Sequence, residues 1–400
     1  MRILSVSHYA PPHVGGLEAL VDALASRLTQ RGHEVTVVSS TAGLRDGLGI
    51  PRSNPPEYRM IYVPALNKFF EARLGIPYPI FAPSLVTVLR REVARADVLH
   101  VHGFLFQSTL AAQAIAHRAS HRPVVVLTEH VGHVPYRNPI LDRIEAAAIA
   151  TLGRWSARAS DVTVVYNASV AGTIARIAPG TPVHWIDNGI DTDLFRPASD
   201  SERARLRAEL GWDDRPRVLF GGRAVAKKGL DVALEAARAG DGAFTLGVVG
   251  TMQAPAGAPN VERVGLLSRE RMAAVMRAAD ALLAPARGEG LPVTIQEALS
   301  SGLPVVATDD PGYRDSLAGM GAAVRLMSAD GRLMARALVE LLESPTSREA
   351  AGASVPLARR RFSLDAYAEQ HERLYAELLE SRSGKPDPGH RSRPKQGAAR

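Results

Sequence analysis

The most informative segment of the chain is Pro285-Ala-Arg-Gly-Glu289-Gly-Leu-Pro-Val-Thr-Ile-Gln-Glu297-Ala-Leu-Ser-Ser-Gly302-Leu-Pro304-Val-Val. Pro292 suits the first turn of a helix, because the N–H that proline lacks has no partner there. Gly302 suits the position just past a helix, and Pro304 prevents the helix from continuing. The pattern therefore predicts a helix from about Pro292 to Ser301.

Two short apolar segments flank this helix. Residues 282–284 precede it and residues 303–307 follow it, and both have the uninterrupted apolar character of strands buried in a parallel sheet. Glu289 falls on the turn that leaves the first strand. Because such turns lie at the carboxyl edge of a parallel sheet, where ligands bind, we expect a binding site at this edge.

The polar groups of this segment suit a nucleotide. The N–H groups of Gly290 and Leu291 would face the sheet edge with the positive end of the helix behind them, which favours a diphosphate. Glu297, about a turn further on, offers two acceptor oxygens for the paired hydroxyls of a ribose. A surface helix that happens to carry glutamates would show the same pattern, so the rest of the chain has to decide.

Size and composition indicate a large globular protein. The chain has 400 residues, more than one hydrophobic core normally spans, and 46% of them are hydrophobic, so we expect two domains. It has no cysteine, which excludes disulfides, thiolate zinc sites and a cysteine nucleophile.

The positive charge is concentrated at one end. The net charge is +7, but residues 381–400 hold six Lys or Arg against one Asp and supply +5 of it. The nearly neutral body argues against a nucleic-acid partner. The tail lacks the apolar residues needed to fold, so we expect it to be disordered, and a contact with anionic lipid is a further possibility. Because the chain opens directly on a strand pattern and has no apolar run of about 18 residues, we expect a cytoplasmic protein whose membrane contact, if any, is peripheral at the inner face.

Short apolar strands alternate with helical patterns along the body. The first series comprises strands 3–7, 35–39, 98–102, 124–128, 162–165 and 183–186, with a helix over 17–31. The second comprises strands 218–221, 245–249, 281–284 and 305–308, with a helix over 229–239. This rhythm predicts an α/β protein with two doubly wound domains joined near residues 189–197.

Two further helical patterns carry apolar residues at three- and four-residue steps. One covers residues 362–379 and must pack against another element. In the other, Leu141, Ile144, Ala148 and Leu152 recur at helical spacing, and we interpret them as core residues.

Together these residues resemble family 4 of the retaining glycosyltransferases, also called glycosyl transferases group 1, whose fold is named GT-B. The resemblance covers nearly all of residues 1–380. The matching motifs are Gly15-Gly16-Leu-Glu, His100-Val-His102-Gly103, Thr128-Glu-His130, Asn188-Gly189-Ile190-Asp191, Gly222-Arg223-Ala-Val-Ala-Lys-Lys228-Gly229, the Glu289 to Glu297 segment and Gly302-Leu-Pro-Val-Val-Ala-Thr.

The resemblance implies two Rossmann-like domains that face each other across a cleft, with a C-terminal helix crossing back to the N-terminal domain. The expected division is an acceptor-side domain at 1–187, a nucleotide-sugar domain at 188–361, a crossover helix at 362–380 and a disordered basic tail at 381–400.

The resemblance also assigns roles to individual residues. Arg223 and Lys228 would neutralise the donor diphosphate as its negative charge grows, Glu297 would hold the ribose and Glu289 the donor sugar. His130, at the end of a strand, would hydrogen-bond the sugar from the facing domain. Val131 follows it where many relatives have Asp or Gly, which puts the acceptor side of the pocket in question. The predicted catalytic residues are His130, Glu289, Arg223 and Lys228, and the predicted donor-binding residues are Gly15, Gly16, Arg223, Lys228, Glu289, Gly290, Leu291 and Glu297.

The activity implied is the transfer, with retention, of a hexose-type sugar from a UDP- or GDP-linked donor to a hydroxyl acceptor in glycan, glycolipid or small-molecule glycoside synthesis. No metal or other cofactor is expected, and in this family the departing phosphate is thought to help deprotonate the acceptor. The aromatic and basic segment 66–81 could meet a lipid-linked acceptor or a membrane surface, or it could be a partly buried loop.

Other readings stay open. A GT-B protein can be a sugar-nucleotide epimerase or a glycoside phosphorylase. A metal-dependent hydrolase could use His100, His102, His130 and His133 as ligands, although it would leave the Glu289 to Glu297 segment unexplained. Asp191-Thr-Asp193 matches a metal-binding string of other glycosyltransferases, and we interpret this match as a coincidence within the interdomain crossover.

Overall fold

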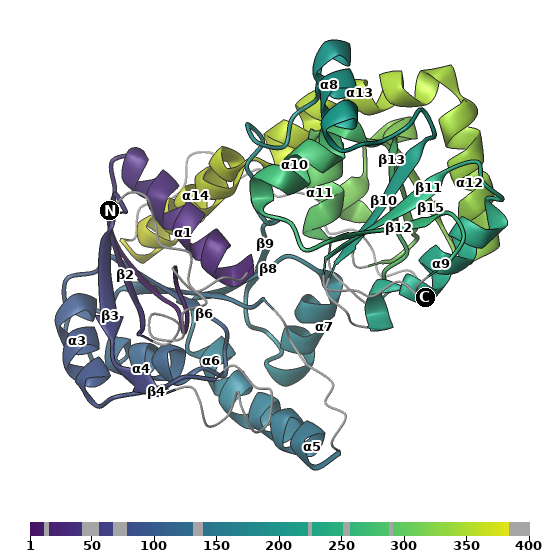
Figure 1. The fold of residues 1–400 in the computed structure, drawn as a ribbon. Coiled ribbons are helices and arrows are strands. Elements are labelled where there is room, and N and C mark those ends of the chain that lie inside the picture. The colour runs from purple at the N-terminus through teal and green to yellow at the C-terminus, as the bar shows by residue number, and fades with distance from the viewer. Residues whose placement is uncertain are drawn as a thin grey trace.

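The structure is a computed structural model that describes residues 1–11, 16–41, 56–66, 78–130, 139–222, 226–250, 257–287, 291–311 and 313–383. Two parallel sheets, each with helices packed against it, form its two halves (Figure 1). The predicted α/β fold is therefore confirmed.

The N-terminal sheet has seven strands in the order β3-β2-β1-β6-β7-β8-β9. Their bounds are β1 Arg2–Val6, β2 Glu34–Ser40, β3 Arg59–Val63, β6 Val98–His102, β7 Val124–Thr128, β8 Val162–Val165 and β9 Val183–Trp185. A separate antiparallel pair is formed by β4 Ala65–Leu66 and β5 Ile80–Phe81. The helices of this half are α1 Gly16–Gln30, α3 Ser84–Val93, α4 Gln107–Ala116, α5 Pro139–Ala148, α6 Arg154–Arg158 and α7 Ala168–Ile177, with a π-helical turn at Ile149–Gly153.

The C-terminal sheet has six strands in the order β12-β11-β10-β13-β14-β15. Their bounds are β10 Arg217–Gly222, β11 Thr245–Gly250, β12 Val261–Gly265, β13 Ala281–Ala284, β14 Val305–Thr308 and β15 Val324–Met327. The helices of this half are α8 Asp200–Glu209, α9 Leu230–Ala239, α10 Arg269–Ala278, α11 Val293–Ser300, α12 Gly331–Glu343 and α13 Pro345–Phe362. Short 3-10 turns lie at Ala226–Lys228, Asp315–Leu317 and Gly321–Ala323.

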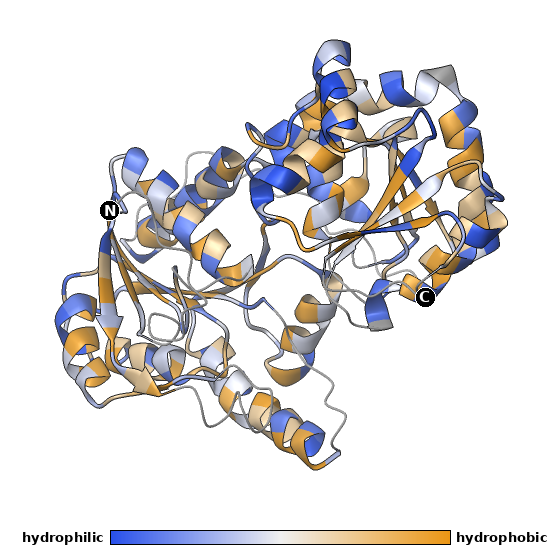
Figure 2. Ribbon diagram, in the orientation of Figure 1, coloured by the Kyte–Doolittle hydropathy of each residue, from blue (hydrophilic) through white to orange (hydrophobic). Residues whose placement is uncertain are grey.

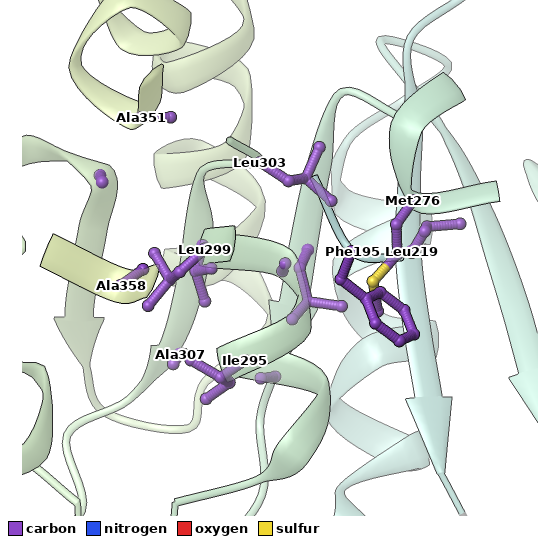
Figure 3. Close-up of a cluster of buried hydrophobic side chains, with 14 of the residues drawn as sticks. Phe195, Leu219, Met276, Ile295, Leu299, Leu303, Ala307, Ala351 and Ala358 are labelled. Carbon is purple, nitrogen blue, oxygen red and sulfur yellow. The ribbon is translucent and has the colours of Figure 1, made fainter. Parts of the chain in front are cut away.

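Each sheet buries apolar side chains on both faces. In β1, Ile3 belongs to one buried cluster while Leu4 and Val6 belong to another, as expected because successive strand residues point to opposite faces. In the C-terminal half, Leu219 of β10 and Ile295 of α11 share a cluster (Figure 3). This packing fixes α11 against the sheet and thereby positions the helix predicted to carry the site.

The chain passes between the halves twice, and the two passages are hydrogen-bonded to each other. The N–H of Ile190 donates to the carbonyl of Phe362 at 2.7 Å, and the N–H of Leu364 donates to the carbonyl of Ile190 at 3.0 Å. The last helix, α14 Leu364–Arg382, then packs along α1, and its Tyr367 and Tyr375 join the N-terminal core. It begins two residues later than the predicted 362–379, because Phe362 is the last residue of α13 and Ser363 caps α14.

One core prediction is wrong. Ile144 and Leu152 are 60% and 47% exposed, and α5 has no buried residue. Figure 1 shows α5 projecting from the N-terminal half, and Figure 2 shows hydrophobic residues along it. Helical spacing identifies an apolar face, but whether that face is buried depends on a neighbouring element, and none covers this face in the part of the chain that the structure describes. In that same part, no helix is both long and apolar enough to cross a membrane.

Candidate functional site

Two strands of the C-terminal sheet end side by side at its carboxyl edge. Gly222 ends β10 and is paired with Gly250, which ends β11. A Cβ added to Gly250 would lie 2.3 Å from the carbonyl oxygen of Gly222, and the φ of Gly250 is +106°. Only glycine satisfies both the space and the backbone angle at this position. The backbones of the two strand ends therefore lie in close contact at this edge.

Lys228 lies over this edge. It ends the 3-10 turn that follows β10, and a Cβ added to Gly222 would lie 3.2 Å from its Cδ and Cε. Gly229 has a φ of +76°, and a Cβ there would lie 2.5 Å from the carbonyl oxygen of Pro285. The N–H of Arg287 donates to the carbonyl of Lys227 at 2.9 Å. The turn that carries Lys228 is thus held against the turn that leaves β13.

The helix predicted over residues 292–301 is α11, Val293–Ser300, with Pro292 as its N-cap. Gly302 has a φ of +69° and follows the helix, and the N–H of Leu303 donates to the carbonyl of Ala298 at 2.9 Å. This is the capping arrangement that glycine favours at a helix end. Leu291 is 4% exposed and belongs to the core, so its side chain anchors the N-terminal end of α11.

Glu297 lies in the second turn of α11. Burial raises the pKa of its carboxyl to about 7, and the nearby positive charge of Arg269 opposes this rise. No described residue donates a hydrogen bond to the carboxylate or forms an ion pair with it. The preceding Gln296 is 1% exposed and donates from Nε2 to the carbonyl of Asn188 at 3.0 Å, which ties α11 to the crossover. When it is ionised, Glu297 therefore offers two acceptor oxygens that no described residue uses.

A second group of polar residues lies at the carboxyl edge of the N-terminal sheet. His130 follows β7, and its Nε2 lies 3.2 Å from Nδ1 of His102 on β6. Nε2 of His102 lies 3.2 Å from Oγ of Ser5 on β1. The carbonyl of His130 accepts a hydrogen bond from the hydroxyl of Tyr166. Both the ring and the backbone of His130 are thus positioned by neighbouring strands.

Gly16 is the first residue of α1, beyond the end of β1. A Cβ built on it would have no other atom within 4 Å, so the space beside this backbone is open. That is the condition a ligand-approaching backbone requires.

His100, His102 and His130 are neutral and hydrogen-bonded. Nδ1 and Nε2 of His100 each lie 2.7 Å from a hydroxyl, those of Tyr375 and Thr128 respectively. Burial lowers the pKa of His130 to about 3 and that of His102 well below its ordinary value. A metal ion would have to displace these hydrogen bonds, and no cluster of three or more metal-ligating side chains occurs within the described residues. His133 lies outside them.

The two aspartates of the Asp-x-Asp string make structural contacts within the chain. Oδ1 of Asp191 accepts from the N–H groups of Asp193 and Leu194 at 3.1 and 3.0 Å, which closes a turn. Asp193 pairs with Arg359 at 2.8 Å. Both carboxylates therefore tie the crossover together.

The structure places the predicted residues in two groups, Lys228, Leu291 and Glu297 in the C-terminal half and Gly16 and His130 in the N-terminal half. Gly15, Arg223, Glu289 and Gly290 were also predicted, and they lie outside the described residues. Sequence reasoning did not find Ser5, Tyr166, Arg269 or Gln296. Ser5 could have been found, since it lies beside His100 once β1 and β6 are paired in parallel.

Comparisons with known proteins identify the family that this chain resembles. The model of Glycosyltransferase Family 4 matches residues 14–194, and that of Glycosyl transferases group 1 matches residues 215–344. D-inositol 3-phosphate glycosyltransferase of Corynebacterium jeikeium is 26% identical over 98% of both chains. GDP-mannose-dependent alpha-mannosyltransferase of Mycolicibacterium smegmatis is 28% identical over 83% of this chain and 85% of that protein. The crystal structure of HepE from Anabaena in complex with UDP has a TM-score of 0.70 at 17% identity, covering 94% of this chain and all of HepE.

Proposed function

This chain belongs to glycosyltransferase family 4 and has its GT-B fold, and we propose that it transfers a hexose-type sugar, with retention, from a UDP- or GDP-linked donor to a hydroxyl acceptor. The donor choice is supported by the names of two similar proteins, since HepE was crystallised with UDP and the mycobacterial mannosyltransferase uses GDP-mannose. Residues 188–361 would bind the donor and residues 1–187 the acceptor.

The environment of Glu297 is the observation that supports this proposal most strongly. A carboxylate whose pKa is raised to about 7 by burial, and which accepts no hydrogen bond from a described residue, is costly unless a ligand supplies the missing donors. The 2′- and 3′-hydroxyls of a ribose are adjacent donors that one carboxylate can accept together. Glu297 would therefore recover, on binding, the free energy that its burial costs.

Lys228 would provide the positive charge that stabilises the leaving diphosphate. Its stem is held over Gly222, so its ammonium group is positioned without being ordered by the ligand. Negative charge grows on the diphosphate as the glycosidic bond breaks, and a fixed cation stabilises that change. Arg223 and the N–H groups of Gly290 and Leu291 would share this task, and Glu289 would contact the hydroxyls of the donor sugar.

The N-terminal half would close the site from the other side. His130 would hydrogen-bond the donor sugar. Gly16, whose backbone has open space beside it, would approach the phosphate and the acceptor together with Gly15. The departing phosphate would accept the acceptor's proton on the same face, so the reaction needs no carboxylate nucleophile. The positive charge already present in Lys228 and Arg223 could serve in place of a metal ion.

The acceptor is an alcohol whose class is suggested by a relative. The corynebacterial relative acts on D-inositol 3-phosphate by its name, which favours a polyol or a lipid-linked polyol. Leu66 of β4 and Ile80 of β5 are 80% and 43% exposed, and they offer an apolar contact for a lipid-linked acceptor or for the membrane that carries it.

Thermal unfolding in the presence of UDP, GDP, ADP and TDP, with and without a chelator, tests this proposal. A ligand that binds only the folded state raises the melting temperature. We expect UDP or GDP to give the largest rise, unchanged by chelator, and expect Lys228→Ala and Glu297→Ala to reduce it while the unliganded proteins stay folded. A rise that disappears with chelator would refute metal independence, and no rise with any nucleotide would refute the donor site.

A further inference from the structure

A chain of three side chains crosses the N-terminal sheet beneath His130. It runs from Oγ of Ser5 on β1 to Nε2 of His102 on β6, and from Nδ1 of His102 to Nε2 of His130. Both distances are 3.2 Å. Ser5 and His102 are 6% and 1% exposed, so water does not readily replace either bond. The protons of this chain must therefore be arranged among its own members.

The number of protons decides the arrangement. Both histidines are neutral, because burial lowers the pKa values of His102 and His130. Each neutral imidazole carries one N–H, and the serine carries one O–H, so three hydrogens share two hydrogen bonds. One hydrogen must point out of the chain, either from Ser5 at one end or from His130 at the other.

At the Ser5 end, the described residues provide no acceptor for an outward-pointing hydroxyl hydrogen. Within the described part of the chain, His102 is the one hydrogen-bond partner of the Ser5 hydroxyl, and a buried hydroxyl hydrogen without an acceptor is unfavourable. The Ser5 hydroxyl therefore donates to Nε2 of His102, and Nδ1–H of His102 donates to Nε2 of His130. The remaining proton is on Nδ1 of His130.

We propose that Ser5 and His102 are positioning residues that hold His130 in its Nδ1–H tautomer, so that it presents a hydrogen-bond donor to a sugar oxygen. This role rests on the proposed function, but the tautomer itself does not. In this state His130 has no free lone pair, because Nε2 accepts from His102. It can orient and stabilise an oxygen of the donor sugar, and it is not the base that deprotonates the acceptor.

The tautomer can be observed without a substrate. In protein labelled with ¹⁵N-histidine at neutral pH, two-bond ¹H–¹⁵N correlation spectra distinguish the Nδ1–H from the Nε2–H form, and the His130 signals are assigned by their loss in His130→Gln. We expect His130 of the wild-type protein to be protonated at Nδ1. Protonation at Nε2 would overturn the proposal whatever the enzyme's activity.

Variants of Ser5 test whether its hydroxyl determines the tautomer of His130. Ser5→Ala removes the hydroxyl donor, so we expect the His130 pattern to shift toward the Nε2–H form, whereas Ser5→Thr keeps the hydroxyl and the wild-type pattern. Thr163→Val is the matched control, because Thr163 on β8 is also buried and its hydroxyl has no hydrogen-bond partner among the described residues. An unchanged His130 pattern in folded Ser5→Ala would overturn the assignment of Ser5. If that variant does not fold, the wild-type spectrum still decides the tautomer.

Kinetics separate positioning from a merely structural role. With the nucleotide sugar that stabilises the protein, we expect Ser5→Ala to lower the kcat of donor hydrolysis about tenfold while KM changes by less than about twofold. A loss confined to KM would contradict the proposed role of His130. Failure of every nucleotide sugar to react would refute the proposed function and leave the tautomer assignment to the spectra.

Discussion

The side chain of Lys228 lies across Gly222, so close that a Cβ on Gly222 would be 3.2 Å from two of its methylene carbons. The absence of a side chain on Gly222 thus leaves the space that the side chain of Lys228 occupies. Because Gly222 ends β10 and Lys228 ends the turn that follows, the strand and the turn together direct a positive charge to the sheet edge.

Replacing Gly222 by alanine should therefore displace Lys228. We expect Gly222→Ala to weaken binding of the stabilising nucleotide at least about tenfold, the loss typical of one charge-assisted hydrogen bond, as measured by isothermal titration calorimetry. Gly211→Ala is the control for backbone strain, since Gly211 has a φ of +68° and open space around it. Equal effects of the two variants on nucleotide affinity would show that Lys228 is not held by Gly222.

The raised pKa of Glu297 predicts a cost to stability. Its carboxyl keeps its proton up to about pH 7 in the folded protein but ionises near its ordinary value of 4.5 when unfolded. Between these pH values the folded state binds more protons, so stability falls as pH rises, and the cost persists above pH 7. We expect Glu297→Gln to raise the free energy of unfolding at pH 8 by on the order of 2 kcal/mol relative to wild type. Chemical denaturation at pH 4 and pH 8 measures this, and a less stable variant at pH 8 would mean that the carboxylate has a partner in the free protein.

The same group should make donor binding depend on pH. Ribose hydroxyls bind an ionised carboxylate more strongly than a protonated carboxyl, and the diphosphate of a nucleotide sugar does not titrate near neutrality. We expect wild-type affinity to rise about tenfold from pH 6 to pH 8, and Glu297→Gln to bind more weakly and without this dependence. Calorimetric titration of both proteins at three pH values measures this dependence. A wild-type affinity that does not change with pH would show that Glu297 does not bind the ribose.

The exposed face of α5 predicts tolerance to substitution. Ile144 is 60% exposed, so Ile144→Ser should change the free energy of unfolding by less than about 0.5 kcal/mol. Ile149, in the turn that follows α5, is 5% exposed, and Ile149→Ser should cost about 3 kcal/mol or more. Urea denaturation of the two variants compares them directly, and a large loss in Ile144→Ser would mean that another element covers this face in solution.

The fold could be predicted where burial leaves a continuous apolar pattern. Strands β6, β7, β8, β13 and β14 lie inside the sheets, and their observed bounds agree with the predicted ones. The edge strands β3, β12 and β15 were not predicted, because their side chains are partly exposed and their sequences mix polar with apolar residues. Helix α13 was missed for another reason, since it contains Pro356, which argues against a helix in sequence alone.

The site could be predicted where one segment carries it. The caps of α11 and the place of Glu297 follow from Pro292 and Gly302, which act within a few residues. The bond from Gln296 to Asn188 and the chain from Ser5 through His102 to His130 could not be predicted, because they join residues between 28 and 108 positions apart. Such contacts depend on strand order and register, which local patterns do not specify.

The anomer released by slow donor hydrolysis tests whether this enzyme cleaves a nucleotide sugar with retention, as we propose. Purified protein is incubated with UDP-glucose or GDP-mannose, according to which nucleotide stabilises it, and ¹H NMR follows the sugar before mutarotation, with Lys228→Ala as the background. Since both donors are α-linked, we predict that the α-anomer appears first and that Lys228→Ala releases it much more slowly. Appearance of the β-anomer first would contradict retention, and equal rates for the two proteins would contradict the assigned site.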